Sequence, residues 1–420
     1  MSAIEASETY KVFGRRPERA VERLRAGASR ADLRKDGLTP AVIDASFSVS
    51  AGEIFVVMGL SGSGKSTLIR MVNGLLEPTA GSMMIDGQDI TQLSPAKLRA
   101  VRRDKVSMVF QHFALFPHRT VGENAAYGLQ VQGLSRSDRE AKADEALQMV
   151  GLDGWGGSLP GQLSGGMRQR VGLARALATG TQIMLMDEAF SALDPLIRRE
   201  MQDQLVELQN RLDKTILFIT HDLNEAMRLG DRIAMMRDGR IVQVGTAEQI
   251  LNDPANDYVA QFVQDVDRTR VLTASSVMEP PVAVLGAESG PRAAHKLMRE
   301  HQTSSLFVLN RDKTLNGVVR EENVARAVES GEDTLAGALE TNVVAVHGDT
   351  AVADLFADSA HSPTALAVVD DDRRLLGVIP RVTLLNALGR GSHADSAAGS
   401  RSAAAPATSG GSETTMEAAR

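Results

Sequence analysis

A glycine-rich loop at residues 59–66 constrains the fold of this chain more than any other stretch. Its sequence, GLSGSGKS, fits the phosphate-binding pattern G-x-x-x-x-G-K-[ST]. The preceding run EIFVVMG at 53–59 is rich in β-branched and aromatic residues, which predicts a buried parallel strand. A strand that ends in such a loop predicts an α/β fold of the P-loop NTPase type, with its ligand at the carboxyl end of the strand.

Each residue of the loop has an expected task. Gly59, Gly62 and Gly64 let the backbone turn tightly so that its N–H groups face the phosphates. The helix that begins near Lys65 directs the positive end of its dipole at them. Lys65 is expected to bridge the β- and γ-phosphates, and the Ser66 hydroxyl is expected to bind Mg²⁺. The predicted nucleotide contacts in the loop are Gly59, Ser61, Gly62, Ser63, Gly64, Lys65, Ser66 and Thr67.

A second acidic centre is expected at the same edge of the sheet. The apolar run IMLMDE at 183–188 ends in two carboxylates, and Asp187 is placed to hold Mg²⁺ directly or through water. Glu188 is the candidate general base beside the attacking water. His221 follows another apolar strand, ILFITHD, and is expected to contact the γ-phosphate. The alternative for Asp187 and Glu188 is that they are only solubilising residues at the end of a strand. The alternative for His221 is a purely structural role.

Two further motifs lie downstream of the loop, LSGGMRQR at 163–170 and MLMDEAFSALD at 184–194. With the loop, they resemble the ATPase subunit of an ABC transporter, specifically the glycine betaine/L-proline (osmoprotectant) importer ATPases with C-terminal CBS domains. The resemblance spans about residues 10–390 and includes Met167, which replaces the usual Gln in the betaine subgroup. It implies an ABC ATPase domain with a helical subdomain, followed by an α+β tandem CBS module.

The resemblance assigns further roles residue by residue. Gln111, in MVFQHFALFPH, would sense the γ-phosphate and the permease and lie near Mg²⁺. Ser164, Gly165 and Gly166 would form the signature that completes the nucleotide site of a partner subunit, which implies a homodimer. SALD at 191–194 resembles the loop that contacts that partner. The catalytic set would then be Lys65, Gln111, Glu188 and His221.

The implied function is hydrolysis of ATP, with Mg²⁺, to drive import of a quaternary ammonium compatible solute such as glycine betaine, proline or choline. The implied partners are integral-membrane permease subunits and a periplasmic or lipid-anchored solute-binding protein. The subunit would then lie peripherally on the cytoplasmic face of the cell membrane. The alternative is a soluble CBS-regulated ABC ATPase that is not coupled to transport. Such proteins usually carry two cassettes or a long coiled-coil insertion, and this chain has neither feature.

Composition narrows these choices. A net charge of −7 argues against a general nucleic-acid binder, which would need a basic face. No apolar run approaches the roughly 18 to 20 residues that span a bilayer, so the membrane pathway is expected to come from another chain. The chain has no cysteine, which excludes disulfides and cysteine-based metal sites.

ABC ATPases usually stack the adenine on an aromatic residue upstream of the phosphate loop. Phe13, in TYKVFG, occupies the matching sequence context, and Tyr10 is the competitor. The adjoining residues 11–35 contain nine Lys or Arg against three Asp or Glu, a local excess of six. This basic segment is either a membrane-facing or permease-facing helix or a solvated helix on an acidic protein.

The pattern along the chain separates a sheet from a helical part. Residues 53–117 and 180–245 alternate apolar strands with amphipathic helices, while residues 118–175 are mostly helical. The segment that enters the helical part is unusually aromatic for an exposed loop. It is either local core or a docking groove for a permease coupling helix. Its apolar residues are Phe113, Leu115, Phe116 and Pro117.

The C-terminal part contains an internal repeat with an offset of 60 residues. Residues 306–328 align without gaps on 366–388, and seven of the 23 positions are identical. Each copy reads as strand, acidic turn, glycine-containing strand and helix, which resembles a pair of CBS motifs. The alternative is a coincidental hairpin duplication. The places where nucleotide-binding CBS motifs carry Ser/Thr and Asp hold Arg320, Asn323, Pro380 and Thr383.

These replacements disfavour capture of a nucleotide by the repeat. In betaine importers the module is implicated in sensing ionic strength at an anionic membrane, which requires a cationic patch. Residues 270–390 carry 12 Lys or Arg and 16 Asp or Glu, a net charge of −4, so no bulk charge marks such a patch. We expect an ATPase domain at 1–268, a regulatory CBS pair at 272–390 and a disordered tail at 391–420.

Overall fold

The computed structural model describes residues 2–264 and 268–389. It divides into two compact units, Met1–Val266 and Asp267–Arg420, and the division falls two residues before the predicted end of the ATPase part. The predicted disordered tail at 391–420 lies outside the described residues. Within the described ranges, no helix is both long and apolar enough to span a bilayer.

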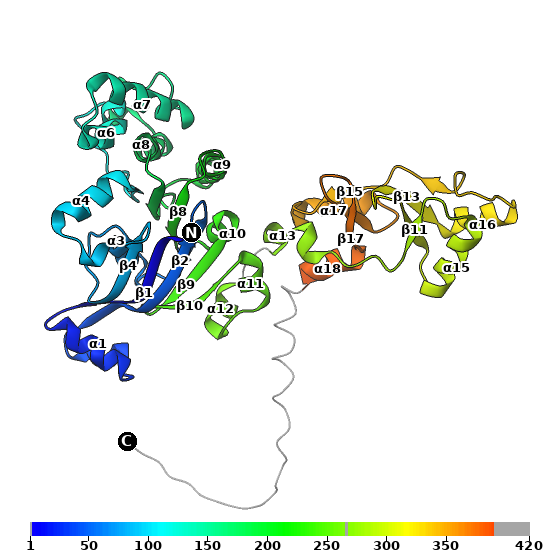
Figure 1. The fold of residues 1–420 in the computed structure, drawn as a ribbon, viewed down its shortest axis with the longest axis horizontal. Helices are drawn as coiled ribbons and strands as arrows, with labels where there is room; N and C mark the ends of the chain where they lie inside the picture. The colour runs from blue at the N-terminus through cyan, green and yellow to red at the C-terminus, as the bar shows by residue number, and fades with distance from the viewer. Residues whose placement is uncertain (1, 265–267, 390–420) are drawn as a thin grey trace, which may run out of the picture. The chain divides into compact units, whose positions relative to one another are not determined.

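A six-stranded sheet forms the centre of the first unit (Figure 1). Its strand order is β10-β9-β3-β8-β7-β6, with the strands from β9 to β6 parallel and β10 antiparallel to β9. Every residue of β3 is buried, as expected for a strand covered on both faces. The strands are β3 (Ile54–Met58), β6 (Val106–Val109), β7 (Ile183–Asp187), β8 (Thr215–Thr220), β9 (Arg232–Arg237) and β10 (Arg240–Gly245).

The parallel register brings the carboxyl ends of three strands together. Met58 at the end of β3 pairs with Thr220, and Asp187 at the end of β7 pairs with Ile219 in the same neighbouring strand, β8. The loop after β3 therefore lies beside the acidic end of β7. The helices that surround this sheet are α3 (Lys65–Val72), α4 (Pro95–Asp104), α9 (Pro195–Leu212), α10 (Leu223–Leu229), α11 (Ala247–Asn252) and α12 (Asp257–Phe262).

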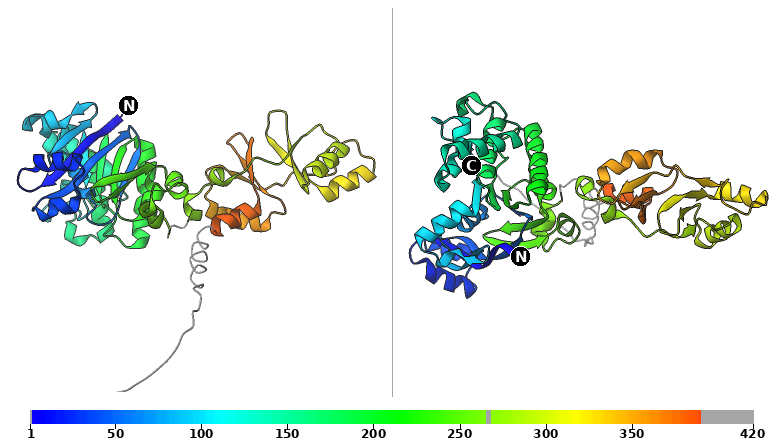
Figure 2. Two further views of the ribbon diagram at one scale, coloured as in Figure 1. Left: turned by 90° about the horizontal axis from the view of Figure 1, so that it is seen from below. Right: turned by 45° about the horizontal axis from the view of Figure 1, so that its top comes forward.

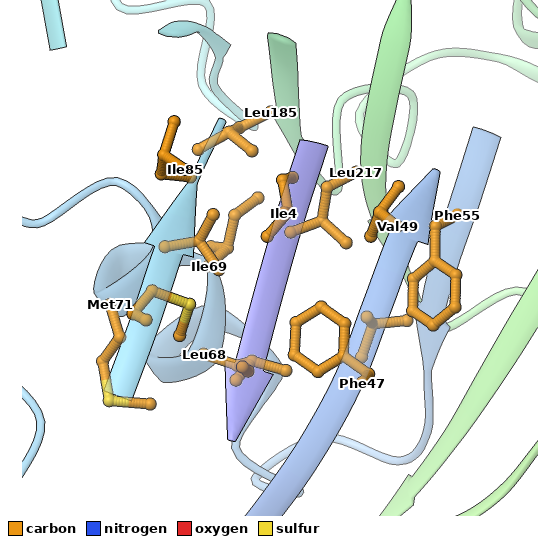
Figure 3. Packing of buried hydrophobic residues seen from close by; sticks show 14 of the residues in the cluster. Ile4, Phe47, Val49, Phe55, Leu68, Ile69, Met71, Ile85, Leu185 and Leu217 are labelled. Atoms are coloured by element: carbon orange, nitrogen blue, oxygen red, sulfur yellow. The ribbon is translucent and has the colours of Figure 1, made fainter. Parts of the chain in front are cut away.

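An antiparallel sheet of order β2-β1-β4-β5 supplies the second layer of this unit. Its side chains interleave with those of α3 and the central sheet (Figure 3), and the rings of Phe47 and Phe55 stack with 5.4 Å between centroids. The apolar core thereby joins both sheets. The elements are β1 (Ser2–Phe13), β2 (Thr39–Ser50), β4 (Ala80–Ile85), β5 (Gln88–Asp89), η1 (Ile90–Gln92) and, between β1 and β2, α1 (Pro17–Arg25) and α2 (Arg30–Lys35).

A helical segment gathers at one end of the first unit (Figure 1). Its first helix starts with a capping box between Thr120 and Glu123. The fully buried Asn124 fixes the chain that leads into it, because its amide donates to three carbonyls of residues 116–120. The helices are α5 (Val121–Ala125), α6 (Tyr127–Gln132), α7 (Arg136–Met149), η2 (Pro160–Gln162) and α8 (Gly165–Ala178).

Two small sheets form the second unit, and each has a pair of helices beside it, α15 with α16 and α17 with α18 (Figures 1 and 2). The first sheet has the order β11-β12-β13-β14 and the second β15-β16-β17. The strands are β11 (Val284–Gly286), β12 (Ser305–Leu309), β13 (Leu315–Arg320), β14 (Leu339–Glu340), β15 (Ala345–His347), β16 (Leu366–Val369) and β17 (Leu375–Ile379). The helices are α13 (Arg268–Val271), α14 (Ala274–Val277), α15 (Pro291–His301), α16 (Glu321–Glu329), α17 (Val352–His361) and α18 (Arg381–Gly389).

The two hairpins of this unit repeat the same register. Val308 pairs with Gly317 in the first hairpin, and Val368 pairs with Gly377 in the second. Both hairpins then shift register at the next pair. The offset of 60 residues is thus kept in space, so the repeat is a structural one and not a coincidence of sequence. One apolar cluster joins the hairpins and comprises Phe307, Leu315, Val318, Ala367, Val369 and Val378.

Candidate nucleotide-binding site

The loop between β3 and α3 leans on two neighbouring strands. Gly59 has φ of 150° and Gly64 has φ of 109°. A Cβ atom at Gly59 would collide with the carbonyl oxygen of Met236, and one at Gly64 would collide with that of Ala41. Glycine is therefore required at both positions by backbone conformation and by space. Gly62 also has a positive φ, 77°, but a Cβ there would meet nothing within 4 Å.

Lys65 lies inside the loop that it follows. Its side chain is only 4% exposed, and its Nζ donates to the carbonyl oxygens of Gly59, at 2.8 Å, and Leu60, at 3.2 Å. Burial lowers the pKa of Lys65, and the nearby carboxylates of Glu188 and Asp187 act in the opposite direction. The Lys65 ammonium therefore lies near two carboxylates, at a position where it could bind phosphate oxygens. Its predicted bridge between β- and γ-phosphates remains a prediction.

Ser66 and Asp187 form the pair expected to hold Mg²⁺. The Ser66 Oγ donates to Asp187 Oδ1 at 3.3 Å, although the two residues are 121 positions apart. Burial raises the pKa of Asp187, while the bond from Ser66 lowers it. Within the described residues, no group of three or more His, Cys, Asp or Glu could hold a metal alone. One hydroxyl and one carboxylate fit Mg²⁺, because this ion prefers oxygen ligands and takes others from water and nucleotide phosphates.

Three of the predicted catalytic residues meet at the carboxylate of Glu188. His221 Nδ1 lies 3.1 Å from Glu188 Oε2, and Gln111 Nε2 donates to the same oxygen at 3.3 Å. The backbone of Glu188 has φ of 46°, and its N–H donates to the carbonyl of Ile219 at 2.9 Å. Three separate strand ends thus bring a carboxylate, an amide and an imidazole together beside the phosphate loop.

Sequence reasoning missed a further member of this cluster, Ser191. Gln111 Nε2 donates to Ser191 Oγ at 3.3 Å, and this hydroxyl donates to the carbonyl of Glu188 at 2.9 Å. Ser191 therefore fixes both the amide and the turn that follows the acidic strand. The available signal was its place as the first residue of the SALD stretch at 191–194.

The signature residues lie at the start of α8. Ser164 is the N-cap, and its Oγ accepts the N–H of Met167 at 3.3 Å. A Cβ at Gly166 would come within 2.6 Å of Ile197 in α9, whereas one at Gly165 would meet nothing within 4 Å. Across the described ranges, no hydrogen bond links Ser164 to the phosphate loop, so the structure does not bring the signature and its own loop together.

The two candidates for adenine stacking have opposite environments. Tyr10 is 4% exposed and packs in an apolar cluster with α1, whereas Phe13 is 41% exposed. Phe13 pairs with Thr39 in β2, the strand whose Ala41 backs the phosphate loop. The exposed ring is therefore Phe13, and its contact with adenine remains a prediction.

The aromatic entry to the helical segment is held by local contacts. The ring of Phe116 packs against Tyr127 with 4.7 Å between centroids, and its N–H donates to Asn124 at 2.8 Å. Phe113 and Ala114 both have positive φ, 56° and 48°, and their carbonyls accept from the Arg175 guanidinium. Local core and a docking groove for a permease coupling helix both remain possible roles, because half-buried rings contribute to packing and still expose one face to solvent.

The basic segment forms α1 and α2, which pack on the antiparallel sheet. Val21 and Leu24 of α1 and Leu33 of α2 are buried against Tyr10. Most of the segment's charged side chains are exposed. Arg30 is an exception, since it reaches the phosphate loop.

Comparisons with known proteins agree with these features. The family described as "ABC transporter" matches residues 42–191, and the family described as "CBS domain" matches residues 274–330 and 336–390. The chain is 50% identical to the glycine betaine/carnitine transport ATP-binding protein GbuA of Listeria monocytogenes, over 92% of this chain and 98% of that protein. It is 48% identical to the glycine betaine/proline betaine transport system ATP-binding protein ProV of Escherichia coli, with the same coverage.

A solved structure supports the fold of the first unit. It is the dimeric post-hydrolysis state of an ATP-binding cassette bound to ADP and Pi. The sequence identity is 31% and the TM-score 0.50, over 58% of this chain and 98% of that one. The chain therefore belongs to the family of ABC transporter ATP-binding proteins with C-terminal CBS domains, which includes the glycine betaine transport ATP-binding proteins.

Proposed function

We propose that this chain energises import of a quaternary ammonium compatible solute, of the class of glycine betaine, proline or choline, through a separate permease. The observation that carries this proposal is the similarity to GbuA and ProV over 98% of their length, which includes both units of this chain. Hydrolysis of ATP is the reaction of the family. The solute is inferred from the relatives, because it would not touch this subunit.

The site residues divide the chemistry among them. Glu188 would orient the attacking water and accept its proton, and His221 and Gln111 both contact its Oε2 and would hold the carboxylate in place. Lys65 would neutralise charge on the β- and γ-phosphates. Ser66 and Asp187 would hold Mg²⁺, which supplies charge neutralisation at the same phosphates when bound.

A homodimer would complete the nucleotide site. The hydroxyl of Ser164 is free of the loop that follows β3 in its own chain, and the related cassette of known structure is described as dimeric. A Lys65→Ala subunit mixed with a Ser164→Arg subunit should keep one intact composite site per dimer, whereas either homodimer should have none. Equal ATP binding by all three dimers would reject the head-to-tail arrangement.

The second unit would regulate and not bind a nucleotide. Two of the positions where nucleotide-binding CBS motifs carry Ser/Thr and Asp hold Asn323, which donates to Glu340 at 2.8 Å, and Thr383, which donates to Glu279 at 2.7 Å. Because carboxylates of the same unit occupy these donors, ribose hydroxyls would have to compete with them. Sensing of ionic strength at an anionic membrane is the remaining candidate for this unit.

Reconstitution tests the whole proposal. The subunit would be combined in liposomes with its permease and its periplasmic or lipid-anchored binding protein, and uptake of labelled glycine betaine, proline and choline would be measured. We expect ATP-dependent uptake of at least one of them, with this subunit on the cytoplasmic face. Hydrolysis without a co-purifying membrane partner would favour the soluble CBS-regulated ATPase instead.

A further inference from the structure

The segment between β1 and β2, which forms α1 and α2, contacts the phosphate loop, and the motif G-x-x-x-x-G-K-[ST] does not predict this contact. Arg30, the first residue of α2, donates from Nη2 to the carbonyl oxygen of Gly62 at 3.2 Å. Its Nη1 donates to Asp238 Oδ1 at 2.9 Å. The side chain of Arg30 is 16% exposed, whereas that of Asp238 is 69% exposed. The guanidinium therefore lies beneath the surface, between the loop and the turn that joins β9 to β10.

Side-chain packing does little to hold Gly62. A Cβ at this position would meet nothing within 4 Å, and its φ of 77° lies in the left-handed region that glycine adopts without strain. By contrast, Gly59 and Gly64 are wedged against the carbonyls of Met236 and Ala41. The middle of the loop is thus the part least restrained by packing.

The contact with Arg30 fixes the direction of one peptide plane. In a trans peptide the C=O of Gly62 and the N–H of Ser63 point to opposite sides. Arg30 binds the carbonyl of this peptide, and the Ser63 N–H at its other end donates to the carbonyl of Leu60 at 3.1 Å, so the two bonds together fix the peptide plane. Backbone N–H groups held in fixed directions are the donors that phosphate oxygens need in such a loop.

A second contact limits the next peptide. Gly239, beside Asp238 in the β9–β10 turn, donates its N–H to the carbonyl of Ser63 at 2.9 Å. The two successive carbonyls of Gly62 and Ser63 are therefore both bound from outside the loop, one by a cation and one by a backbone N–H. Gly239 lies in the same turn as Asp238, the residue that forms the salt bridge with Arg30.

We propose that Arg30 is a positioning residue for nucleotide binding, which pre-orients the Ser63 N–H by holding the Gly62 carbonyl outside the phosphate loop. This inference rests on the proposed nucleotide role of the loop. It assigns to the inserted segment a task in the ATP site in addition to whatever its exposed charges do.

The test compares three variants in the full-length chain. Arg30→Met removes the donors but keeps an unbranched side chain of similar reach, Arg30→Lys keeps the charge, and Arg34→Met is the control, because Arg34 is exposed on the same helix. ATP affinity would be measured by calorimetric titration with and without Mg²⁺, together with KM, kcat and the melting temperature of each protein.

Arg30→Met should weaken ATP binding and raise KM by about tenfold, at the low end for a hydrogen bond from a charged group, with kcat within about twofold. Arg30→Lys should recover part of the affinity, and Arg34→Met should bind ATP like the wild type. A lower melting temperature with unchanged ATP affinity would overturn the inference and leave Arg30 a structural residue. Failure of the wild type to bind ATP would instead reject the proposed function.

Asp238→Asn separates the loop contact from the salt bridge. This variant keeps a hydrogen-bond acceptor for Arg30 but removes the charge, and the carbonyl of Gly62 stays available. ATP affinity within about threefold of the wild type is expected, since the Asp238 side chain is 69% exposed and solvent weakens its ion pair with Arg30. If Asp238→Asn weakens binding as much as Arg30→Met, the salt bridge and not the loop contact is the cause, and the inference fails.

Discussion

Polar side chains lie at strand ends in the first unit and in the first turn of the helices that follow strands in the second, and their partners differ. In the first unit, Gln111 and His221 converge on the carboxylate of Glu188 beside a glycine-rich loop. In the second unit, Asn323 and Thr383 follow glycine-containing strands at equivalent places, and each is bound to a carboxylate of its own unit. Similar α/β elements therefore support the proposed catalytic edge in one unit and side chains already paired with carboxylates in the other. Side chains at the edge decide function, while the fold only presents them.

Removal of the Glu188 carboxylate is the strongest test of whether the strand ends of the first unit are catalytic. Glu188→Gln should lower kcat for ATP by at least about 10²-fold, the lower bound for losing general-base assistance. Binding of MgATP should persist, because Lys65 and the loop are untouched. Steady-state hydrolysis and an ATP titration check the two halves of this prediction.

A glutamate elsewhere in the first unit provides the matched control. Glu207 is exposed on α9, so Glu207→Gln makes the same chemical change away from the strand ends. Its kcat should equal that of the wild type. Hydrolysis retained by Glu188→Gln would remove Glu188 from the role of base.

Loss of the buried cation should affect binding before chemistry. Lys65→Ala should weaken ATP affinity roughly 10- to 100-fold, since hydrogen bonds to a charged group contribute about 1.5 to 3 kcal/mol. Lys97→Ala, an exposed lysine at the start of α4, is the control and should bind normally. Unchanged affinity in Lys65→Ala would contradict the phosphate-binding role.

A buried carboxylate of the first unit should make stability depend on pH. Glu225 is 5% exposed and accepts from Thr220 and from Gln202, and burial raises its pKa above the ordinary value of 4.5 despite these bonds. A raised folded-state pKa means that the folded chain holds the proton more tightly than the unfolded chain. The resulting stability is fully present below pH 4.5 and is lost as pH rises through the folded-state pKa.

Glu225→Gln isolates this effect because the amide is neutral at every pH. The melting temperature of the variant minus that of the wild type should increase as pH is raised from about 4.5 to 8, by roughly 2 to 4 °C for each kcal/mol in a unit of this size. Glu322→Gln, on an exposed site of the second unit, should show no such trend. A constant difference in melting temperature across this range would show that folding does not raise the pKa of Glu225.

Removal of the second unit should have the smallest effect on hydrolysis. A chain ending after about residue 264 keeps every phosphate-handling residue named above, so its kcat and KM should stay within about twofold. With the permease in anionic liposomes, activation of transport by salt should be lost, since salt screens exposed charges over about 10 Å at 0.1 M. Superimposable salt curves for the full and shortened chains would reject the ionic-sensor role.

Features that depend on local pattern were predictable from the sequence. The strand, loop and helix around Lys65 follow from one motif, and the approach of His221 to Glu188 follows from the rule that parallel strands end at one edge, whereas Gln111 was identified by the family resemblance. The repeat at an offset of 60 residues predicted two equivalent hairpins with Gly317 and Gly377 in their second strands, and the structure shows that the two hairpins share one register. These features require no knowledge of contacts across the unit.

Contacts across long separations were not predictable. The choice between Tyr10 and Phe13 stayed open because β1 contains register shifts on either side of Thr9, which break the simple alternation of faces. The bond from Arg30 to Gly62 joins residues in different elements, and no periodicity marks it. The positive φ values of Phe113 and Ala114 depend on capture of their carbonyls by Arg175, from another helix.

The pairing at the edges of the two hairpins has a consequence for how the second unit folds. Glu340, which lies within the second CBS match, pairs with Val318 of the first hairpin, and Glu279, which lies within the first match, pairs with Val378 of the second. Each motif thus contributes a paired segment to the hairpin of the other motif. Neither motif alone would have its full set of strand neighbours, so the pair should unfold in a single cooperative transition. Separating the two motifs would leave each hairpin with an unpaired strand edge.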